Sequence, residues 1–297
     1  MTAAALAERW VEHRGYRVWT GTAAGDPTRP PLVCVPGGPG LSHAYLAGLA
    51  ALAARGGSVI FYDPVGCGAS DRPTEIQWSL DFVTGEIVAV LDGLALPRAH
   101  LYAHSFGGIP AVEVALAHPQ RTAGLILSSV PLDVREYMAV VLRFIAELGP
   151  ELGAALARGE YDPRARDLAY ARAYYEYVKR HICRLTPLPD VIRDPGYNWE
   201  AHRALKGGLL LYTGALRRWS ALDRLGALAA PALLCCGRHD AVTAAACRAA
   251  AGRMPRAEVE VFADSSHLPH LEEPERYRDV LSAFLARADQ APATSAR

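Results

Sequence analysis

The sequence predicts an α/β fold built on a mostly parallel, doubly wound sheet with an inserted helical cap. Three short apolar runs, at 31–35, 58–62 and 100–103, each end in a turn that is rich in Gly or carries Ser. This pattern is typical of parallel strands that are buried on both faces and carry functional loops at their carboxyl ends. Helical stretches rich in Ala and Leu, at 44–55 and 79–94, alternate with these runs, as they do in a doubly wound sheet.

Further elements extend this sheet on both sides. Residues 9–22 alternate in polarity around a turn at Arg14-Gly15, which predicts an antiparallel hairpin that opens the sheet. Two more buried strands are expected at 125–129 and 232–236. After them, the pattern predicts a helix at 243–253, a strand at 259–262 and a helix at 275–287.

The domain organisation follows from the distance between the last two core strands. About a hundred residues separate them, far more than one crossover helix needs. Residues 131–212 have helical patterns rich in Tyr, Arg and His, and we interpret them as a helical cap over the strand ends. The predicted core is then 1–130 and 213–288. The Ala, Pro, Thr and Ser of 289–297 favour a flexible tail.

The composition indicates a soluble globular protein with a large core, since 51% of its residues are hydrophobic and 21% are charged. Lys plus Arg and Asp plus Glu both number 31, so no net charge attracts nucleic acid or an anionic membrane. The expected partner is a small-molecule or short peptide-like substrate, with no nucleic acid and no membrane. Composition leaves the oligomeric state open.

The sequence also favours a cytoplasmic protein. Its N-terminal residues lack a basic segment, and their short apolar run stops at Glu8 and Arg9, unlike a secretory signal. No apolar stretch is long enough to span a bilayer. Four of the six cysteines lack metal-ligand spacing, and the adjacent Cys235 and Cys236 cannot easily pair. Free thiols fit a reducing cytoplasm.

Ser105 is the predicted nucleophile. It lies in Ala103-His-Ser-Phe-Gly107, directly after a predicted strand and before a predicted helix. A G-x-S-x-G sequence in this position forces the serine onto a strained turn that exposes its hydroxyl, and its small neighbours relieve the crowding there. Ala103 replaces the first glycine and is also small. A serine in an ordinary strand-to-helix loop is the alternative interpretation.

Asp240 and His267 are the predicted partners of Ser105, because the order nucleophile, acid, base is typical of such folds. Each follows a predicted strand, so each lies at the same sheet edge as Ser105. The imidazole can move the hydroxyl proton while the carboxylate fixes its tautomer. His239 and His270 are the rival bases, and His267 is preferred over both.

The predicted oxyanion hole combines the N–H of Phe106 with an N–H of the turn after the strand at 31–35. Glycine lets that backbone approach the substrate oxygen without a clash. Gly38 is the preferred donor and Gly37 the second choice. The alternative is that this cluster of Gly and Pro forms only a turn.

These segments together resemble the proline iminopeptidase family of α/β hydrolases. The resemblance covers nearly the whole chain, more weakly in the cap. It implies the α/β-hydrolase fold, a serine nucleophile, no cofactor or metal, and a cap that shapes the substrate pocket. The segments that carry it are Pro36-Gly-Gly-Pro-Gly, Phe61-Tyr-Asp-Pro-Val-Gly-Cys-Gly-Ala-Ser-Asp, the Ser105 turn, Gly-Arg-His-Asp240 and Ser-Ser-His267-Leu.

Two departures from the family pattern bear on the substrate. The family's usual H-G-G-P-G begins here with Pro36, which removes a His that normally supports the oxyanion turn. The resemblance also implies acidic side chains that hold the free α-ammonium of a peptide, but alignment places Leu209 and Ala241 at those positions. A buried ammonium without a carboxylate partner is very costly. Recognition of a free amine is therefore in doubt.

Residues of the cap, and Glu113 on the helix behind Ser105, offer two ways to form a pocket. Glu113, Glu176 and Glu200 are acids that could replace the missing ones, although each is expected to face solvent or to be structurally paired. Aromatic side chains instead favour an apolar pocket, or else belong to the core, since helical spacing fits both. The predicted substrate-binding residues are Tyr174, Tyr175, Trp199, Leu209 and Tyr212.

The leading hypothesis is a serine hydrolase that cleaves an amide or ester of a small, fairly apolar substrate through an acyl-Ser105 intermediate. One alternative is a proline iminopeptidase that releases N-terminal residues from peptides. Another is an acyl-transfer, cyclising or releasing enzyme of a biosynthetic pathway, in which a drier pocket favours a nucleophile other than water. The last is a non-catalytic small-molecule binder of the same fold, which would have no need for Ser105, Asp240 and His267 together.

Overall fold

The computed structural model describes residues 6–190, 194 and 196–290, and it shows one mixed sheet of eight strands in the order β1-β2-β4-β3-β5-β6-β7-β8. β1 and β2 form the expected antiparallel hairpin, β2 pairs antiparallel with β4, and all later neighbours pair in parallel. The strands are β1 (Ala7–His13), β2 (Tyr16–Ala23), β3 (Leu32–Val35), β4 (Val59–Tyr62), β5 (Ala99–His104), β6 (Thr122–Ser128), β7 (Ala232–Gly237) and β8 (Ala257–Phe262).

The central strands are apolar throughout because side chains on both faces of the sheet are buried. In β3, Val33 and Val35 belong to one core cluster, whereas Leu32 and Cys34 belong to a second cluster. Alternate side chains of a strand point to opposite faces, so these two clusters mark the two layers of helices. All six cysteines are buried and free.

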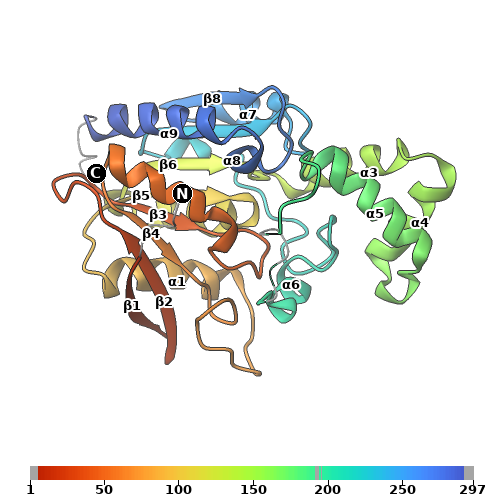
Figure 1. The fold of residues 1–297 in the computed structure, drawn as a ribbon, viewed down its shortest axis with the longest axis horizontal. Coiled ribbons are helices and arrows are strands. Elements are labelled where there is room, and N and C mark those ends of the chain that lie inside the picture. Colours follow the sequence, from red (N-terminus) through yellow and green to blue (C-terminus); the bar gives the residue numbers. More distant parts are fainter. Residues whose placement is uncertain (1–5, 191–193, 195, 291–297) are drawn as a thin grey trace.

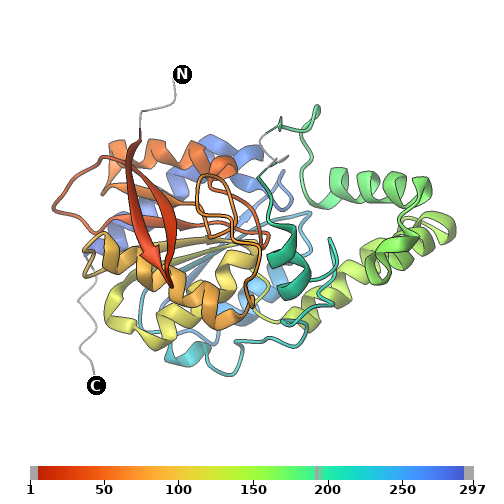
Figure 2. The ribbon, with the colours of Figure 1, turned by 90° about the horizontal axis from the view of Figure 1, so that it is seen from below.

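Helices cover both faces of the sheet (Figures 1 and 2). α1 and α2 pack on each other and on one face, and η1 and α9 pack together on the other. The core helices are the 3-10 helix η1 (Ala44–Arg55) and the α-helices α1 (Leu80–Gly93), α2 (Gly108–Ala117), α7 (Ala244–Ala251), α8 (Pro269–Glu272) and α9 (Pro274–Asp289). The predicted architecture, a mostly parallel sheet with helices on both faces, is confirmed.

Among the described residues between β6 and β7, where the sequence predicts a cap, there are four α-helices and two short 3-10 helices, η4 (Pro163–Ala165) and η6 (Leu225–Ala227). The α-helices are α3 (Val134–Ala146), α4 (Pro150–Tyr161), α5 (Leu168–His181) and α6 (Trp199–Leu205). α3, α4 and α5 extend beyond the sheet, whereas α6 lies close to the core (Figures 1 and 2). The boundaries of the predicted cap, 131–212, stay a prediction.

Two local expectations differ from the structure. The stretch at 44–55 is helical, but as a 3-10 helix. Asp289, the first residue of the predicted flexible tail, instead ends α9, and its carboxylate accepts hydrogen bonds from Arg29 Nε at 2.6 Å and His100 Nε2 at 2.7 Å. These bonds hold the end of α9 against the sheet. Residues 291–297 of the predicted tail, 289–297, lie outside the described residues. Over the described ranges, no helix has the length and apolarity to cross a membrane.

Candidate active site

Ser105 stands on a sharp turn between β5 and α2, in η2 (Ser105–Gly107). Its backbone φ is 53°, in the left-handed region that is costly for a non-glycine residue and is concentrated at functional sites. A Cβ on Gly107 would lie 2.4 Å from the Pro36 carbonyl oxygen, so the crowded turn requires glycine there. The turn places Ser105 in the wall of a cavity rather than inside the sheet.

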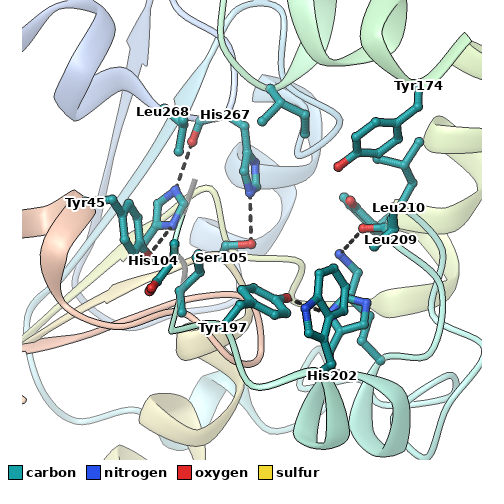
Figure 3. A pocket seen from close by; sticks show the side chains of 17 residues that line it. Tyr45, His104, Ser105, Tyr174, Tyr197, His202, Leu209, Leu210, His267 and Leu268 are labelled. Carbon is teal, nitrogen blue, oxygen red and sulfur yellow. Dashed lines mark hydrogen bonds between the residues drawn. The ribbon is translucent and has the colours of Figure 1, made fainter. Parts of the chain in front are cut away.

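Ser105, His267 and Asp240 are joined by hydrogen bonds. His267 Nε2 lies 2.9 Å from Ser105 Oγ (Figure 3), and His267 Nδ1 lies 3.0 Å from Asp240 Oδ1. Since a carboxylate accepts, Nδ1 carries the proton and Nε2 accepts from the hydroxyl. Asp240 is buried, and its Oδ1 also accepts the N–H of Val242 at 3.0 Å. This arrangement can take a proton from Ser105 and return it to a leaving group.

The two rival histidines do not reach Ser105. His270 is buried, its ring packs edge-on against Tyr45 and His104, and burial lowers its pKa to about 3. A group that stays neutral in this apolar setting suits packing rather than proton transfer. His239 is partly exposed, and its carbonyl accepts a hydrogen bond from His181 Nδ1.

The two glycines of the turn after β3 that were predicted as oxyanion donors, Gly37 and Gly38, differ in their surroundings. Gly38 lines the cavity, and its φ of 113° favours glycine. Gly37 differs, because its N–H donates to the Tyr45 hydroxyl at 2.7 Å and is therefore occupied. The N–H of Phe106 lies in the first turn of a helix, where backbone N–H groups lack intrahelical partners. The geometry therefore favours Phe106 and Gly38 as donors, and it removes Gly37.

Tyr45 and His104 support this turn through a buried hydrogen-bond chain. The Tyr45 hydroxyl lies 3.0 Å from His104 Nδ1, and His104 Nε2 lies 2.9 Å from the His267 carbonyl oxygen. Because a carbonyl only accepts, Nε2 carries the proton, and Tyr45 donates to Nδ1. Burial lowers the pKa of His104 well below its usual value, consistent with a neutral ring. The chain thus links the Gly37 N–H to the backbone of the catalytic candidate His267.

A cavity of about 480 Å³ lies beside Ser105 (Figure 3). Three of the five predicted substrate-binding residues, Tyr174, Trp199 and Leu209, lie in its wall. The described lining residues are Gly38, Leu41, Tyr45, His104, Ser105, Tyr137, Tyr174, Ile182, Asp194, Tyr197, Trp199, His202, Lys206, Leu209, Leu210, His267 and Leu268. The wall is thus formed by residues of the core and by residues between β6 and β7.

The prediction that Tyr175 and Tyr212 line the pocket is wrong. Tyr175 follows Tyr174 in α5, and successive helical residues point about 100° apart, so Tyr174 faces the cavity while Tyr175 is 52% exposed. Tyr212 is buried behind the cavity wall, where its ring packs edge-on against Tyr137 and lies 5.3 Å from Lys206 Nζ.

Lys206 and His202 add polar side chains to this mostly apolar wall. Lys206 is 9% exposed and its Nζ donates to the Leu209 carbonyl at 2.8 Å. His202 Nε2 bonds to the Gly208 carbonyl at 2.9 Å and Nδ1 to the Tyr197 hydroxyl at 2.7 Å, so both ring nitrogens are used. Burial, together with the nearby Lys206 charge, lowers the pKa of His202 to about 4. His202 is therefore neutral.

Asp194 is the carboxylate among the described residues of the wall. Its Oδ2 accepts the N–H of Ser42 at 2.7 Å, and its Oδ1 accepts the N–H of Gly196 at 2.8 Å. Each oxygen accepts one N–H, so Asp194 ties these two backbone segments together and keeps its negative charge.

The acids considered as replacements lie elsewhere. Glu113 pairs with Arg224 at 2.7 Å and Glu176 with Lys179 at 2.8 Å, as the sequence led us to expect, and Glu200 is exposed. None of these three lines the cavity. Among the described residues, no group of three or more His, Cys, Asp or Glu side chains is placed to hold a metal ion.

Comparisons with known proteins agree with this geometry. The profile of the alpha/beta hydrolase fold family matches residues 30–274. The solved proline iminopeptidase of Mycobacterium smegmatis is 31% identical, covers 96% of this chain and 99% of its own, and superimposes with a TM-score of 0.87. The chain belongs to the proline iminopeptidase family of α/β hydrolases. It is a serine hydrolase.

Two further known proteins are similar to this chain over most of their length. The proline iminopeptidase of Heyndrickxia coagulans is 30% identical over 260 residues, which cover 86% of this chain and 90% of that one. The crystal structure of VinJ is 28% identical, covers 96% of this chain and all of its own, and has a TM-score of 0.89. The resemblance to the proline iminopeptidase family inferred from the sequence motifs is confirmed.

Several residues around Ser105 in this proline iminopeptidase family member were not predicted from the sequence. Tyr45 and His104 are 59 positions apart, and no spacing rule connects them. Lys206 had a detectable signal, since a lysine directly before Gly-Gly-Leu-Leu-Leu is unusual in a segment expected to be buried.

Proposed function

We propose that this enzyme cleaves an amide or ester bond of a small, largely apolar acyl substrate that lacks a free ammonium group. Ser105 is the nucleophile, His267 the general base and acid, and Asp240 the carboxylate that orients His267. The N–H groups of Phe106 and Gly38 form the oxyanion hole. Residues 131–212 act as the cap that shapes the acyl pocket.

The reaction follows from these placements. Ser105 Oγ attacks the substrate carbonyl carbon as its proton passes to His267 Nε2, 2.9 Å away. The carbonyl π electrons move to oxygen, and the two backbone N–H groups stabilise that negative charge. Collapse of the tetrahedral intermediate breaks the bond to the amine or alcohol, which takes the proton from His267. Water, deprotonated by His267, then releases the acid and restores Ser105.

One observation carries the choice of substrate: the charge of the cavity wall beside Ser105. Its described residues are mainly aromatic rings and leucines, with one ammonium, Lys206, and one carboxylate, Asp194, whose oxygens both accept backbone N–H groups. A substrate ammonium would find one carboxylate, which already holds two backbone N–H groups, and it would share the cavity with the Lys206 ammonium. Since unpaired charge is costly in such a site, a neutral or anionic acyl group fits better.

A second candidate is a proline iminopeptidase, because several relatives that match nearly the whole chain carry that name. In this case the enzyme would bind the free imino group of an N-terminal proline. The Tyr and Trp rings of the wall could pack on the pyrrolidine ring. The two candidates share Ser105, Asp240 and His267 and differ only in how the amine is received.

Labelling and a matched substrate panel separate these functions. A fluorophosphonate should label wild-type protein at Ser105 and should not label Ser105→Ala. The panel consists of prolyl, alanyl and phenylalanyl 4-nitroanilides, each with a free and an N-acetylated amine, with kcat/KM as the measurement. We expect higher kcat/KM for the acetylated compounds. Ser105→Cys, Asp240→Asn and His267→Gln test the assigned roles.

Each result has a defined meaning. Higher kcat/KM for free prolyl nitroanilide than for its acetylated form would contradict our proposal and support the second candidate. Absence of labelling at Ser105, with no hydrolysis of any compound, would contradict hydrolysis altogether. Lys179→Met, on the outer surface of α5, serves as a variant that leaves the site unaltered, since its side chain pairs with Glu176.

A further inference from the structure

Lys206 is a buried cation that the proposed hydrolytic reaction does not use. Its side chain is 9% exposed and lies in the wall of the cavity beside Ser105. Its Nζ donates one hydrogen bond, to the Leu209 carbonyl at 2.8 Å. An ammonium has three donors, and within the described residues no carboxylate lies within 4.0 Å of this one. Two donors therefore have no protein acceptor there.

The loop that carries Lys206 is firmly held. The Lys206 carbonyl accepts the N–H groups of Thr213 and Gly214, both at 2.7 Å, which closes a loop around Leu209. Glu160 Oε2 accepts the N–H groups of Leu210 at 2.6 Å and Leu211 at 2.9 Å from the side of α4. A charged group on such a fixed loop is preorganised for a ligand.

Glu160 also accounts for how the fold tolerates this charge. Burial lowers the pKa of Lys206 to about 8, and the Glu160 carboxylate partly offsets that change. Glu160 is 2% exposed and is bonded to Tyr170 and to the loop, so it does not enter the cavity. The Lys206 ammonium therefore lines the cavity, whereas the Glu160 carboxylate lies outside it.

Lys206 and Ser105 lie on different sides of the cavity. Leu209 lies across the cavity from Ser105 (Figure 3), and Lys206 Nζ bonds to the Leu209 carbonyl. An acyl group attached at Ser105 would enter this cavity, whose wall also carries Tyr174, Tyr197 and Lys206. His202 is neutral and Asp194 is an anion, so Lys206 is the cation of the described wall that a substrate anion would meet.

We infer that Lys206 determines specificity by binding a carboxylate at the end of the acyl group remote from the scissile bond. The substrate class is then a half-ester or half-amide of a dicarboxylic acid, or an acyl group of equivalent shape. The inference rests on the proposed function and names its substrate. A carboxylate would accept from the two free donors of Lys206, and such charge-assisted bonds are strong in a low-dielectric site. The methylene chain would occupy the apolar middle of the cavity.

Three 4-nitrophenyl esters of matched length test this inference. The acyl groups are adipate, which ends in a carboxylate, hexanoate, which is neutral, and 6-aminohexanoate, which ends in an ammonium. We expect wild-type kcat/KM to fall in that order. In Lys206→Met, which keeps the apolar stem without the charge, KM for the adipate ester should rise roughly tenfold or more, while hexanoate hydrolysis is retained.

Further variants distinguish charge from structure. Lys206→Arg should keep the preference for adipate, and Lys206→Gln, which can still donate to the Leu209 carbonyl, should lose it. Lys179→Met should behave as wild type. Loss of hexanoate hydrolysis in Lys206→Met would show that this variant does not fold. The inference is then tested by the order of kcat/KM in wild type and by the adipate preference of Lys206→Arg and Lys206→Gln.

The inference is overturned if wild type does not prefer adipate over hexanoate, or if the Met and Gln variants keep that preference. In both cases the hydrolysis of hexanoate shows that the proposed function stands. If wild type hydrolyses none of the three esters and a fluorophosphonate does not label Ser105, the proposed function fails and this inference fails with it.

Discussion

At the scale of single residues, Ser105 shows how the chain holds a nucleophile in an unfavourable backbone conformation. Its φ of 53° is stabilised by the packing around it. A Cβ on Gly108 would lie 2.3 Å from the Val130 side chain, so α2 can begin this close to the end of β6 only with glycine. The sequence revealed this position because the small residues that permit the turn are adjacent to Ser105.

The hydroxyl of Tyr45 is expected to position the oxyanion turn. In Tyr45→Phe the Gly37 N–H loses its acceptor and His104 loses its donor, both in a buried setting. We expect kcat for 4-nitrophenyl hexanoate to fall roughly tenfold to hundredfold, with KM almost unchanged. Steady-state kinetics measure this division between kcat and KM.

Tyr161→Phe is the matched control for Tyr45, because Tyr161 is 64% exposed. It should leave both kinetic constants unchanged. A rise in KM without a fall in kcat for Tyr45→Phe would instead show that Tyr45 contacts the substrate and does not act through Gly37.

The charge of Lys206 predicts a pH dependence for the choice of substrate. Burial lowers the pKa of Lys206 to about 8, so the ammonium predominates below that pH and the neutral amine above it. The ratio of kcat/KM for the adipate ester to that for the hexanoate ester should therefore fall as the pH rises through about 8. Since kcat/KM reports ionisation of the free enzyme, and both esters share Ser105 and His267, their titration cancels in the ratio.

Lys206→Arg provides the comparison for this pH profile, because a guanidinium stays protonated across the whole range. Its ratio should stay level where that of wild type declines. A wild-type ratio that does not change between pH 7 and 9 would contradict the prediction.

At the scale of single elements, α1 contains a buried acid, Glu86, whose ionisation lowers the free energy of unfolding. Glu86 is 2% exposed, and its carboxyl accepts the N–H of Val65 at 2.6 Å. Burial raises its pKa from 4.5 to about 8, and the bond from Val65 counteracts this only in part. The folded protein thus binds a proton at Glu86 more tightly than the unfolded chain does, and ionisation destabilises the fold.

Glu86→Gln should therefore be more stable than wild type at neutral and alkaline pH. Below about pH 4.5 both states of wild type are protonated at Glu86 and the penalty is absent. It grows as the pH rises toward about 8 and is then constant, at an order of a few kcal/mol. Urea unfolding of both proteins at pH 5, 6, 7 and 8 measures the difference in the free energy of unfolding.

The exposed Glu12 of β1 supplies the control, since Glu12→Gln removes a charge without a burial penalty. Its difference from wild type should not grow over the same pH range. If the stabilities of Glu86→Gln and wild type change in parallel with pH, the carboxyl of Glu86 ionises in the folded protein as easily as in the unfolded one.

The elements themselves were largely predictable, and the orientation of their side chains was less so. Strands β3 to β7 were visible as apolar runs because each is buried on both faces. Composition alone cannot tell Tyr174 from Tyr175, because both are aromatic and only the helical turn decides which one faces the cavity. The 3-10 geometry of η1 also has no clear signature, since its residues would suit an α-helix equally well.

At the scale of the whole molecule, the reacting side chains were predictable because they follow a topological rule. The carboxyl ends of parallel strands meet at one edge of a sheet, and Ser105 and Asp240 follow β5 and β7. The substrate wall follows no such rule. Tyr45, Tyr174 and Lys206 come from three separate stretches of chain, and only the packing of those stretches on one another brings their side chains to one cavity.

This separation has a consequence for how new activities arise. The groups proposed to perform the chemistry follow the core strands, whereas Tyr174, His202, Lys206 and Leu209 all belong to the chain between β6 and β7. Substitutions can accumulate in that one stretch without changing Ser105, His267 or Asp240. Descendants of one ancestral peptidase could in this way exchange a cationic substrate for an anionic one by a few codon changes, with every intermediate still an active hydrolase.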